Sequence, residues 1–144
     1  MSESKGGSSL ARVVGEAASD EHQKLVKALI DKFVKDGLTI RQASYSGYDQ
    51  PEKMGRHEPD ILARNDAEEL ITIGEAKTCD DLTSERSKEQ FQDFSSRQMS
   101  TGKSKEKAVP FHVIVPKACE EDLAVVLKQL GISNKPNVFR WNLT

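Results

Sequence analysis

Residues 57–77 read HEPDILARNDAEELITIGEAK, with two short apolar runs on either side of a polar segment. The runs ILA and LITI are typical of β-strands and the polar residues between them are typical of a turn, so this stretch predicts a β-hairpin. Carboxylates interrupt both strands, because Asp60 precedes ILA and Glu75 follows LITI after one glycine. Lys77 comes two residues later. Charged side chains at strand positions that face a core require a partner.

The length of the turn decides how the two acids are placed. In an antiparallel hairpin with a four-residue loop at 66–69, the residue numbers of facing pairs add up to a constant, and Asp60 faces Glu75. Facing residues share one side of the sheet, with Cβ atoms about 5 Å apart. Lys77 lies on that side as well, about 6.6 Å farther along its strand. A loop one residue shorter or longer would separate the two acids.

Two carboxylates and an amine in one patch predict a metal site. Carboxylates this close repel each other unless one is protonated or a cation binds between them. Oxygen ligands without cysteine or clustered histidine suit Mg²⁺ or Mn²⁺. Such an ion polarises a phosphoryl oxygen and activates water, and a nearby amine can position that water, accept its proton or stabilise charge on phosphorus. We therefore predict a metal-dependent phosphodiesterase, a hydrolase whose catalytic residues are Asp60, Glu75 and Lys77.

Pro59-Asp60 followed by Glu75-Ala76-Lys77 resembles the signature of the PD-(D/E)XK nuclease superfamily, which includes restriction endonucleases and archaeal Holliday-junction resolvases. The resemblance extends over roughly residues 20–116, where a helix, the hairpin, a second helix and a strand follow in order. It implies a restriction-endonuclease-like fold, with Asp60, Glu75 and the backbone carbonyl of Ala76 as metal ligands and Lys77 as the catalytic lysine. Extended to assembly, it also implies a homodimer with two active centres.

The first predicted helix supplies a further candidate ligand, since many members of this superfamily carry a glutamate there. Glu21 is the preferred candidate because it lies one turn before Leu25, near the apolar edge that faces the sheet, and Glu16 is a second one. The alternative is that Glu21 is a first-turn acid favoured by the helix dipole. Two rows of apolar residues predict one broad face toward the sheet: Leu25, Leu29 and Phe33, and Val26, Ile30 and Val34.

Two accessory residues complete the candidate site. Many resolvase-like members carry a glutamine on the helix after the lysine, and Gln90 is preferred here over Gln92, with a solvated helix face as the alternative. Glu58 lies two residues before the aspartate, hence on the same side of a strand, and is a candidate accessory acid. The chain departs from the resolvase branch in its acidic balance and in lacking the glycine-and-arginine segment often found before the first-helix glutamate.

The rest of the chain predicts helices and strands around the hairpin. A first helix starts at residue 19 or 20 and ends before Gly37; a strand at 39–46, a helix at 83–99, a strand at 109–116, a helix at 119–131 and a strand at 137–142 complete the set. In the order α-β-β-β-α-β-α-β, three consecutive strands favour a meander, and strands separated by helices favour parallel addition through right-handed crossovers. We predict a single α/β domain at 19–144, with a mixed central sheet flanked by helices, after a flexible lead-in at 1–18 that is rich in Ser, Gly and Ala.

Composition limits the class of protein. A chain of 144 residues, 36% hydrophobic and 31% charged, suits one soluble domain without a membrane partner. No apolar run reaches the ~18 residues that cross a bilayer, and the N-terminus lacks the pattern of a secretory signal. Cys79 and Cys119 have no metal-ligand spacing and fit a reduced chain better than a disulfide scaffold or a zinc site. We expect an intracellular protein, cytoplasmic or nucleoid-associated.

The charge distribution bears on partners. A net charge of -2 argues against a domain that coats nucleic acid non-specifically. Positive charge gathers at 53–57 and 97–107, and each segment is either a local phosphate contact or a solvated loop. Tyr45, Tyr48 and Trp141 are candidates to stack on bases, with core or loop packing as the alternative.

These features together predict a DNA endonuclease. DNA is expected rather than RNA and endonuclease rather than exonuclease action, with structure-selective cutting or a targeting partner because the domain is small. The alternative is a non-catalytic nucleic-acid-binding or protein-interaction member of the same fold.

Overall fold

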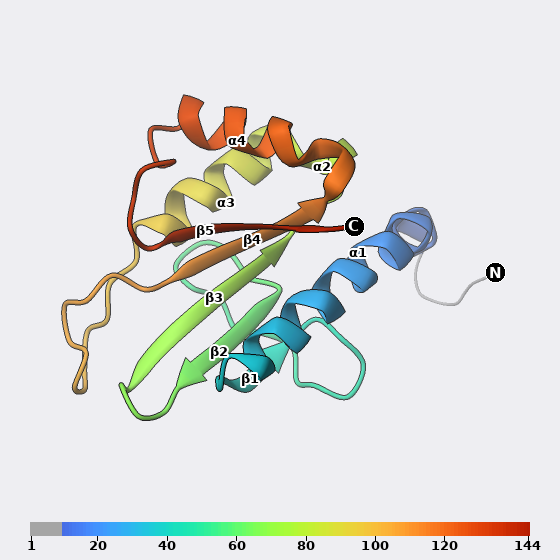
Figure 1. Ribbon diagram of the computed structural model, residues 1–144. Helices are drawn as coiled ribbons and strands as arrows, with labels where there is room; N and C mark the ends of the chain where they lie inside the picture. The colour runs from blue at the N-terminus through green and yellow to red at the C-terminus, as the bar shows by residue number, and fades with distance from the viewer. Residues whose placement is uncertain (1–9) are drawn as a thin grey trace.

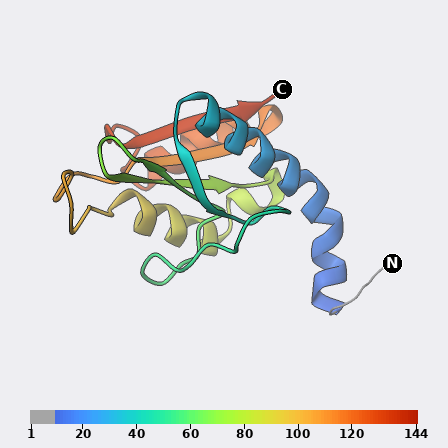
Figure 2. The same cartoon turned by 90° about the horizontal axis from the view of Figure 1, so that it is seen from below.

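Five strands form one mixed sheet in the order β1-β2-β3-β4-β5, with helices on both faces (Figures 1 and 2). The computed structural model describes residues 10–144, with side chains from residue 20 onward. Strands β1, β2 and β3 are antiparallel neighbours, whereas β4 and β5 are added parallel to β3. The elements are α1 (Leu10–Lys35), β1 (Thr39–Ala43), β2 (Ile61–Asn65), β3 (Leu70–Ala76), α2 (Cys79–Leu82), α3 (Glu85–Ser95), β4 (Phe111–Pro116), the 3-10 turn η1 (Lys117–Cys119), α4 (Glu120–Gln129) and β5 (Val138–Leu143). The predicted mixed α/β sheet flanked by helices is confirmed.

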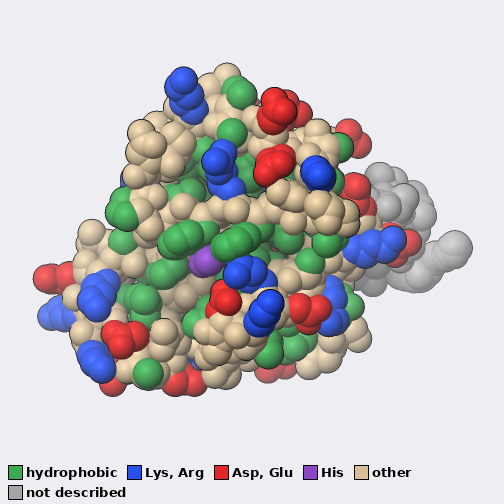
Figure 3. All heavy atoms as spheres, in the orientation of Figure 1, with side chains coloured by type: hydrophobic (Ala, Val, Ile, Leu, Met, Phe, Trp, Pro, Cys, Tyr) green, Lys and Arg blue, Asp and Glu red, His purple; other side chains and the backbone are tan. Residues whose placement is uncertain are grey.

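Helix α1 covers one face of the sheet. Its residues Leu25, Leu29 and Phe33 are buried against β2, β3 and β4, as the four-residue spacing predicts. Val34, expected to be buried with them, is 55% exposed, because the apolar rows turn gradually away from the sheet as the helix proceeds. Phe139 of β5 also remains exposed, and apolar side chains gather over the sheet beside α1 (Figure 3).

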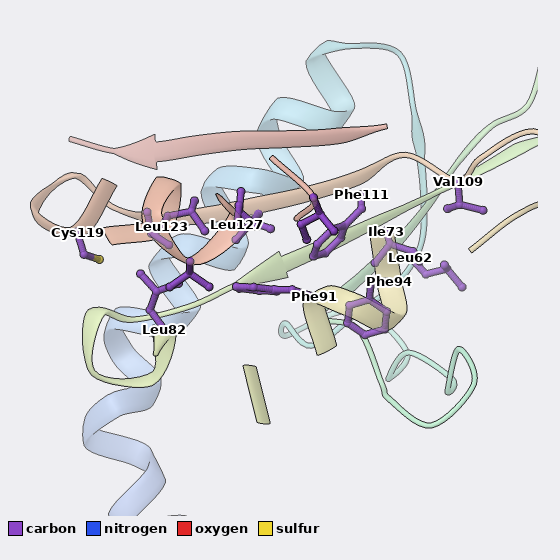
Figure 4. Close-up of a cluster of buried hydrophobic side chains, with 14 of the residues drawn as sticks. Leu62, Ile73, Leu82, Phe91, Phe94, Val109, Phe111, Cys119, Leu123 and Leu127 are labelled. Atoms are coloured by element: carbon purple, nitrogen blue, oxygen red, sulfur yellow. The ribbon is translucent and has the colours of Figure 1, made fainter. Parts of the chain in front are cut away.

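Helices α2, α3 and α4 cover the other face. Phe91 and Phe94 of α3 pack around Phe111 of β4, with ring centroids 5.9 and 5.6 Å from it, and Leu123 and Leu127 of α4 complete the cluster (Figure 4). Buried aromatic pairs with these separations contribute more than their apolar area alone. Because α2 and α3 connect β3 to β4 and α4 connects β4 to β5, this layer fixes the parallel half of the sheet.

Several boundaries differ from those predicted. Helix α1 begins at Leu10 instead of near residue 19, because LARVVGEAA contains good helix formers and no proline. Residues 1–9 of the expected lead-in lie outside the described residues. Strand β1 ends at Ala43, and the one-turn helix α2 was not predicted. Four residues are too few for a periodic pattern to appear.

The prediction of two unpaired cysteines is wrong, since Cys79 and Cys119 form a disulfide with a Cα–Cα distance of 5.7 Å. Cys79 follows β3 and Cys119 follows β4. These strands are parallel neighbours, so the segments that leave their carboxyl ends lie side by side although 40 residues separate the two cysteines. Because the two cysteines are paired, they no longer support the prediction of a reducing compartment.

Within residues 10–144, no helix combines the length and the apolar character needed to cross a membrane. The intracellular location inferred from composition stays a prediction.

Candidate metal and active site

The β2–β3 hairpin has the predicted register. Ile61 pairs with Gly74, so Asp60, one residue before β2, comes next to Glu75. The backbone N–H of Asp60 donates to Oε1 of Glu75 at 3.0 Å, and the backbone N–H of Ala76 donates to Oδ2 of Asp60 at 2.8 Å. The two acids therefore lie side by side at the end of the hairpin opposite its turn.

Lys77 lies beside these acids, as the alternation along β3 predicts. Its Nζ is 3.2 Å from Oε2 of Glu75 and 3.5 Å from Oδ2 of Asp81. It also donates to Oε1 of Gln90, which α3 presents from the layer above. The side chains of Lys77 and Glu75 are each only 4% exposed, and Gln90 is buried. The structure thus brings Gln90 to the lysine, whereas Gln92 on the same helix is exposed.

Burial and charge act together on Glu75. Loss of solvent raises the pKa of this carboxyl well above its ordinary value, and the neighbouring charge of Asp60 raises it further, against the opposing effect of Lys77. A cation between the two carboxylates would counter both causes, because it offsets their repulsion and replaces the lost solvation.

His22 is a site residue that the sequence interpretation missed. Its Nε2 lies 3.0 Å from Oδ2 of Asp60, and its side chain is 28% exposed. The hydrogen bond to Asp60 raises the pKa of His22, against the opposing effect of burial. The signal was present in the spacing, since His22 precedes the buried Leu25 by three residues and Val26 by four, which places it on the face of α1 that meets the sheet.

The other predicted acids differ in where they lie. Glu21 is exposed and lines a hollow with Pro116 and Leu143, because one residue along a helix rotates a side chain by about 100°. Glu58 is exposed and precedes β2, and its role as an accessory acid stays a prediction. The side chain of Glu16 lies outside the described residues.

The candidate donors are oxygen atoms, the type that a hard divalent cation prefers, but their side chains do not form a complete ligand set. Among the described residues, no group of three or more His, Cys, Asp and Glu side chains is placed to hold a metal ion, and the candidate site offers the pair Asp60 and Glu75. The backbone carbonyl of Ala76 remains the predicted third ligand. Mg²⁺ is commonly held by one or two carboxylates and keeps several waters, and this oxygen set without thiolates matches that preference.

The basic segments lie elsewhere. Lys103 donates through Nζ to the backbone carbonyl of Ala67, so the 97–107 segment packs against the β2–β3 turn. The acids lie at the other end of the hairpin, five residues and about 17 Å away. In the 53–57 segment, Nδ1 of His57 lies 2.9 Å from Oδ2 of Asp93 on α3. The 97–107 segment is therefore tied to the turn of the hairpin, and the 53–57 segment is tied to α3.

Comparison with known proteins returned no match, whether with family models, curated proteins or solved structures. The functional inference therefore depends on the residues of this site and on their geometry.

Proposed function

We propose that this protein is a Mg²⁺- or Mn²⁺-dependent nuclease of the PD-(D/E)XK type, which hydrolyses DNA phosphodiester bonds. The observation that supports this most directly is the adjacency of Asp60 and Glu75 with Nζ of Lys77 3.2 Å from the glutamate. Lys77 is buried between Glu75 and Gln90. Burying charged groups costs more free energy than burying apolar side chains of similar size, so stability alone does not account for a lysine at this position.

Each residue has a distinct role in the proposed reaction. Asp60, Glu75 and the carbonyl of Ala76 would hold the ion, which when bound supplies positive charge at a phosphoryl oxygen and lowers the pKa of a coordinated water. Lys77 orients the attacking water and stabilises negative charge on phosphorus. Water adds to phosphorus as the bond to the leaving ester oxygen breaks, giving a phosphomonoester and a free hydroxyl group.

Two further residues act through these groups. Gln90 accepts a hydrogen bond from Lys77 and limits the positions that its ammonium group can take. His22 binds Oδ2 of Asp60, together with the N–H of Ala76, and so constrains the orientation of the carboxylate. Both are positioning residues in this proposal, because each acts through a side chain of the candidate site, Lys77 or Asp60. Outer partners of this kind commonly change metal affinity or activity about 10–100-fold.

The test is cleavage of plasmid, single-stranded and branched DNA with Mg²⁺, with Mn²⁺ and with EDTA. We expect metal-dependent cleavage by the wild type and a loss of at least about 100-fold in Asp60→Asn and in Lys77→Ala. Asp66→Asn is the control, because this acid is exposed at the turn of the hairpin, at the opposite end from Asp60. Binding without cleavage would favour the non-catalytic alternative, and neither binding nor cleavage on any substrate would overturn the nuclease proposal.

A further inference from the structure

A polar hollow of about 510 Å³ adjoins Asp60. It lies between α1 and the loop that follows β1, which runs beside α1 in Figure 1. Its volume falls in the range of small-molecule sites, about 300–1,000 Å³. Among the residues that line it are His22, Ser44, Tyr45, Tyr48, Gln50 and Asp60. Two of them, His22 and Asp60, belong to the candidate metal site, so the hollow and the site are continuous.

Hydrogen bonds hold the loop at a defined place relative to the site. The backbone N–H of Ser44 donates to the carbonyl of Asp60 at 2.8 Å. The side-chain amide of Gln23 on α1 donates to the carbonyl of Ser44, also at 2.8 Å. At the end of β1, the backbone N–H of Ala43 donates to the carbonyl of Asp49 at 2.9 Å and closes the loop. A ligand in the hollow would therefore sit at a fixed distance from the carboxylates.

The lining combines aromatic rings with hydrogen-bonding groups. Tyr45 and Tyr48 enclose a tight turn, in which the N–H of Tyr48 donates to the carbonyl of Tyr45 and Gly47 takes the left-handed conformation with φ of 93°. Tyr48 is 40% exposed, and its ring is available to a ligand. The hydroxyl of Ser44 donates to Oε1 of Gln50 at 3.3 Å, so these two side chains form a polar edge of the hollow. Flat rings together with amide groups suit a nucleobase, which has a π-face and a polar edge.

Two lysines lie on the far side of Tyr45. This side chain also lines a second hollow of about 340 Å³, together with Asp20, Gln23, Lys24 and Lys27. Both lysines are exposed, and Lys27 forms an ion pair with Asp31 at 2.6 Å. A strand that places a base against the tyrosines would bring its next phosphate toward these cations, and Lys and Arg side chains are the usual partners of backbone phosphates.

We propose that the hollow binds the base of an unpaired nucleotide that neighbours the scissile phosphate, and that the substrate is single-stranded DNA or a branched DNA with unpaired nucleotides. This inference rests on the proposed nuclease function. A base within a duplex is stacked and paired on both sides, so it enters such a hollow only after unstacking, which costs a few kcal/mol. An unpaired base does not bear that cost.

The experiment measures binding and cleavage separately. Fluorescence anisotropy with EDTA compares a labelled single-stranded oligonucleotide with the same sequence as a duplex, for the wild type, Tyr48→Ala and Tyr48→Phe. We expect the wild type to bind the single strand more tightly and Tyr48→Ala to weaken that binding about 5- to 100-fold, since one stacked base contributes this much. Tyr48→Phe keeps the ring and should stay near the wild type. Phe139→Ala is the matched control, because this aromatic side chain is 39% exposed on β5, outside the hollow.

A wild type that binds duplex and single strand equally, or a Tyr48→Ala variant that behaves like Phe139→Ala, would overturn the base-binding inference. Cleavage of the same oligonucleotides with Mg²⁺ is measured in parallel. Wild-type cleavage without an effect of Tyr48→Ala leaves the nuclease function intact and removes this inference alone. Failure of the proposed nuclease function would give a different result, because the wild type itself would then cleave none of these oligonucleotides.

Discussion

His22 on α1 and Asp60 at the start of the hairpin are 38 residues apart in sequence, and Nε2 of the histidine lies 3.0 Å from Oδ2 of the aspartate. The same oxygen accepts the backbone N–H of Ala76, so α1 and β3 hold the carboxylate from two sides. Glu75, next to it, is held by Lys77. Both carboxylates are thus oriented by neighbouring groups, which is the condition for a site that binds one ion in one geometry.

The first prediction concerns His22→Ala. Without the histidine, Asp60 loses one of the two groups that orient its carboxylate, and we expect the Mg²⁺ concentration for half-maximal cleavage to rise about 10–100-fold. Metal titration of the cleavage rate measures this. Asp31→Ala, on the exposed side of the same helix, is the control and should leave the titration unchanged. An unaltered metal dependence in His22→Ala would show that the histidine does not position the aspartate.

A second prediction compares two glutamines on α3. Gln90 is buried and accepts a hydrogen bond from Lys77, so Gln90→Ala deprives a buried ammonium group of one partner and should lower the free energy of unfolding by about 1–3 kcal/mol. Gln92 is exposed and donates to the carbonyl of Leu130, so Gln92→Ala should cost about 0.5 kcal/mol or less. Urea unfolding measures both. Equal losses would mean that Gln90 contributes no more than a surface glutamine.

The register of the hairpin was predictable because antiparallel pairing leaves few choices. Once the turn at 66–69 is set, every facing pair follows, and the adjacency of Asp60 and Glu75 follows with them. The side of Lys77 follows from the two-residue period of a strand. These relations depend on short-range geometry, which a single sequence contains.

The contacts of α1 and of the cysteines depend on how elements far apart in the sequence pack together. Local sequence patterns predict such packing less well than they predict the register of a hairpin. The choice between Glu21 and His22 needs the rotation of the helix about its axis, and packing of the whole apolar face sets that rotation. The pairing of Cys79 with Cys119 needs the knowledge that β3 and β4 are neighbours. Spacing within α1 places His22 on the buried face but does not show that this face reaches Asp60, and no spacing within one element shows the cysteine pairing.

Gly74 provides a third prediction, because α1 packs directly on this strand position. A Cβ added there would lie 2.9 Å from Cδ2 of Leu29 and 3.0 Å from Cε2 of Phe33, closer than van der Waals contact allows. We expect Gly74→Ala to lower the free energy of unfolding by about 1–3 kcal/mol, as overpacked core positions do. Denaturant unfolding of Gly74→Ala, Leu29→Ala and the double variant measures the free energy of unfolding of each. The double variant should lose less of this free energy than the sum of the two single losses, because removing the Leu29 side chain makes room for the added methyl group. Strict additivity of the two losses would contradict the contact.

The disulfide leads to a fourth prediction. Cys79 and Cys119 close a loop across a sequence separation of 40, and a bridge of this span stabilises a fold by about 2–4 kcal/mol, mainly by restricting the unfolded chain. A reducing agent should therefore lower the unfolding temperature of the wild type. Cys79→Ser is the control, since its stability should already be reduced and should not respond to the reductant. A wild type that is insensitive to reduction would mean that the bridge does not stabilise the fold.

His112 on β4 makes the stability of the fold depend on pH. It accepts a hydrogen bond at Nδ1 from Nε1 of Trp141 at 2.9 Å and stacks on Phe139, with ring centroids 4.6 Å apart. Burial lowers the pKa of His112 to about 4, below the 6.5 of an exposed histidine. Because the folded state favours the neutral ring, the stabilisation is complete above pH 6.5 and is lost as the pH falls toward 4, by up to about 3 kcal/mol.

The measurement is the free energy of unfolding from pH 7.5 to pH 4 in the wild type and in His112→Phe, whose ring does not titrate. The phenylalanine keeps the stacking on Phe139 but leaves Nε1 of Trp141 without its acceptor, so the variant should be less stable at neutral pH. As the pH falls, the wild type alone must protonate this ring on unfolding, and the difference between the two proteins should shrink. Parallel curves across this range would show that His112 does not carry the pH dependence.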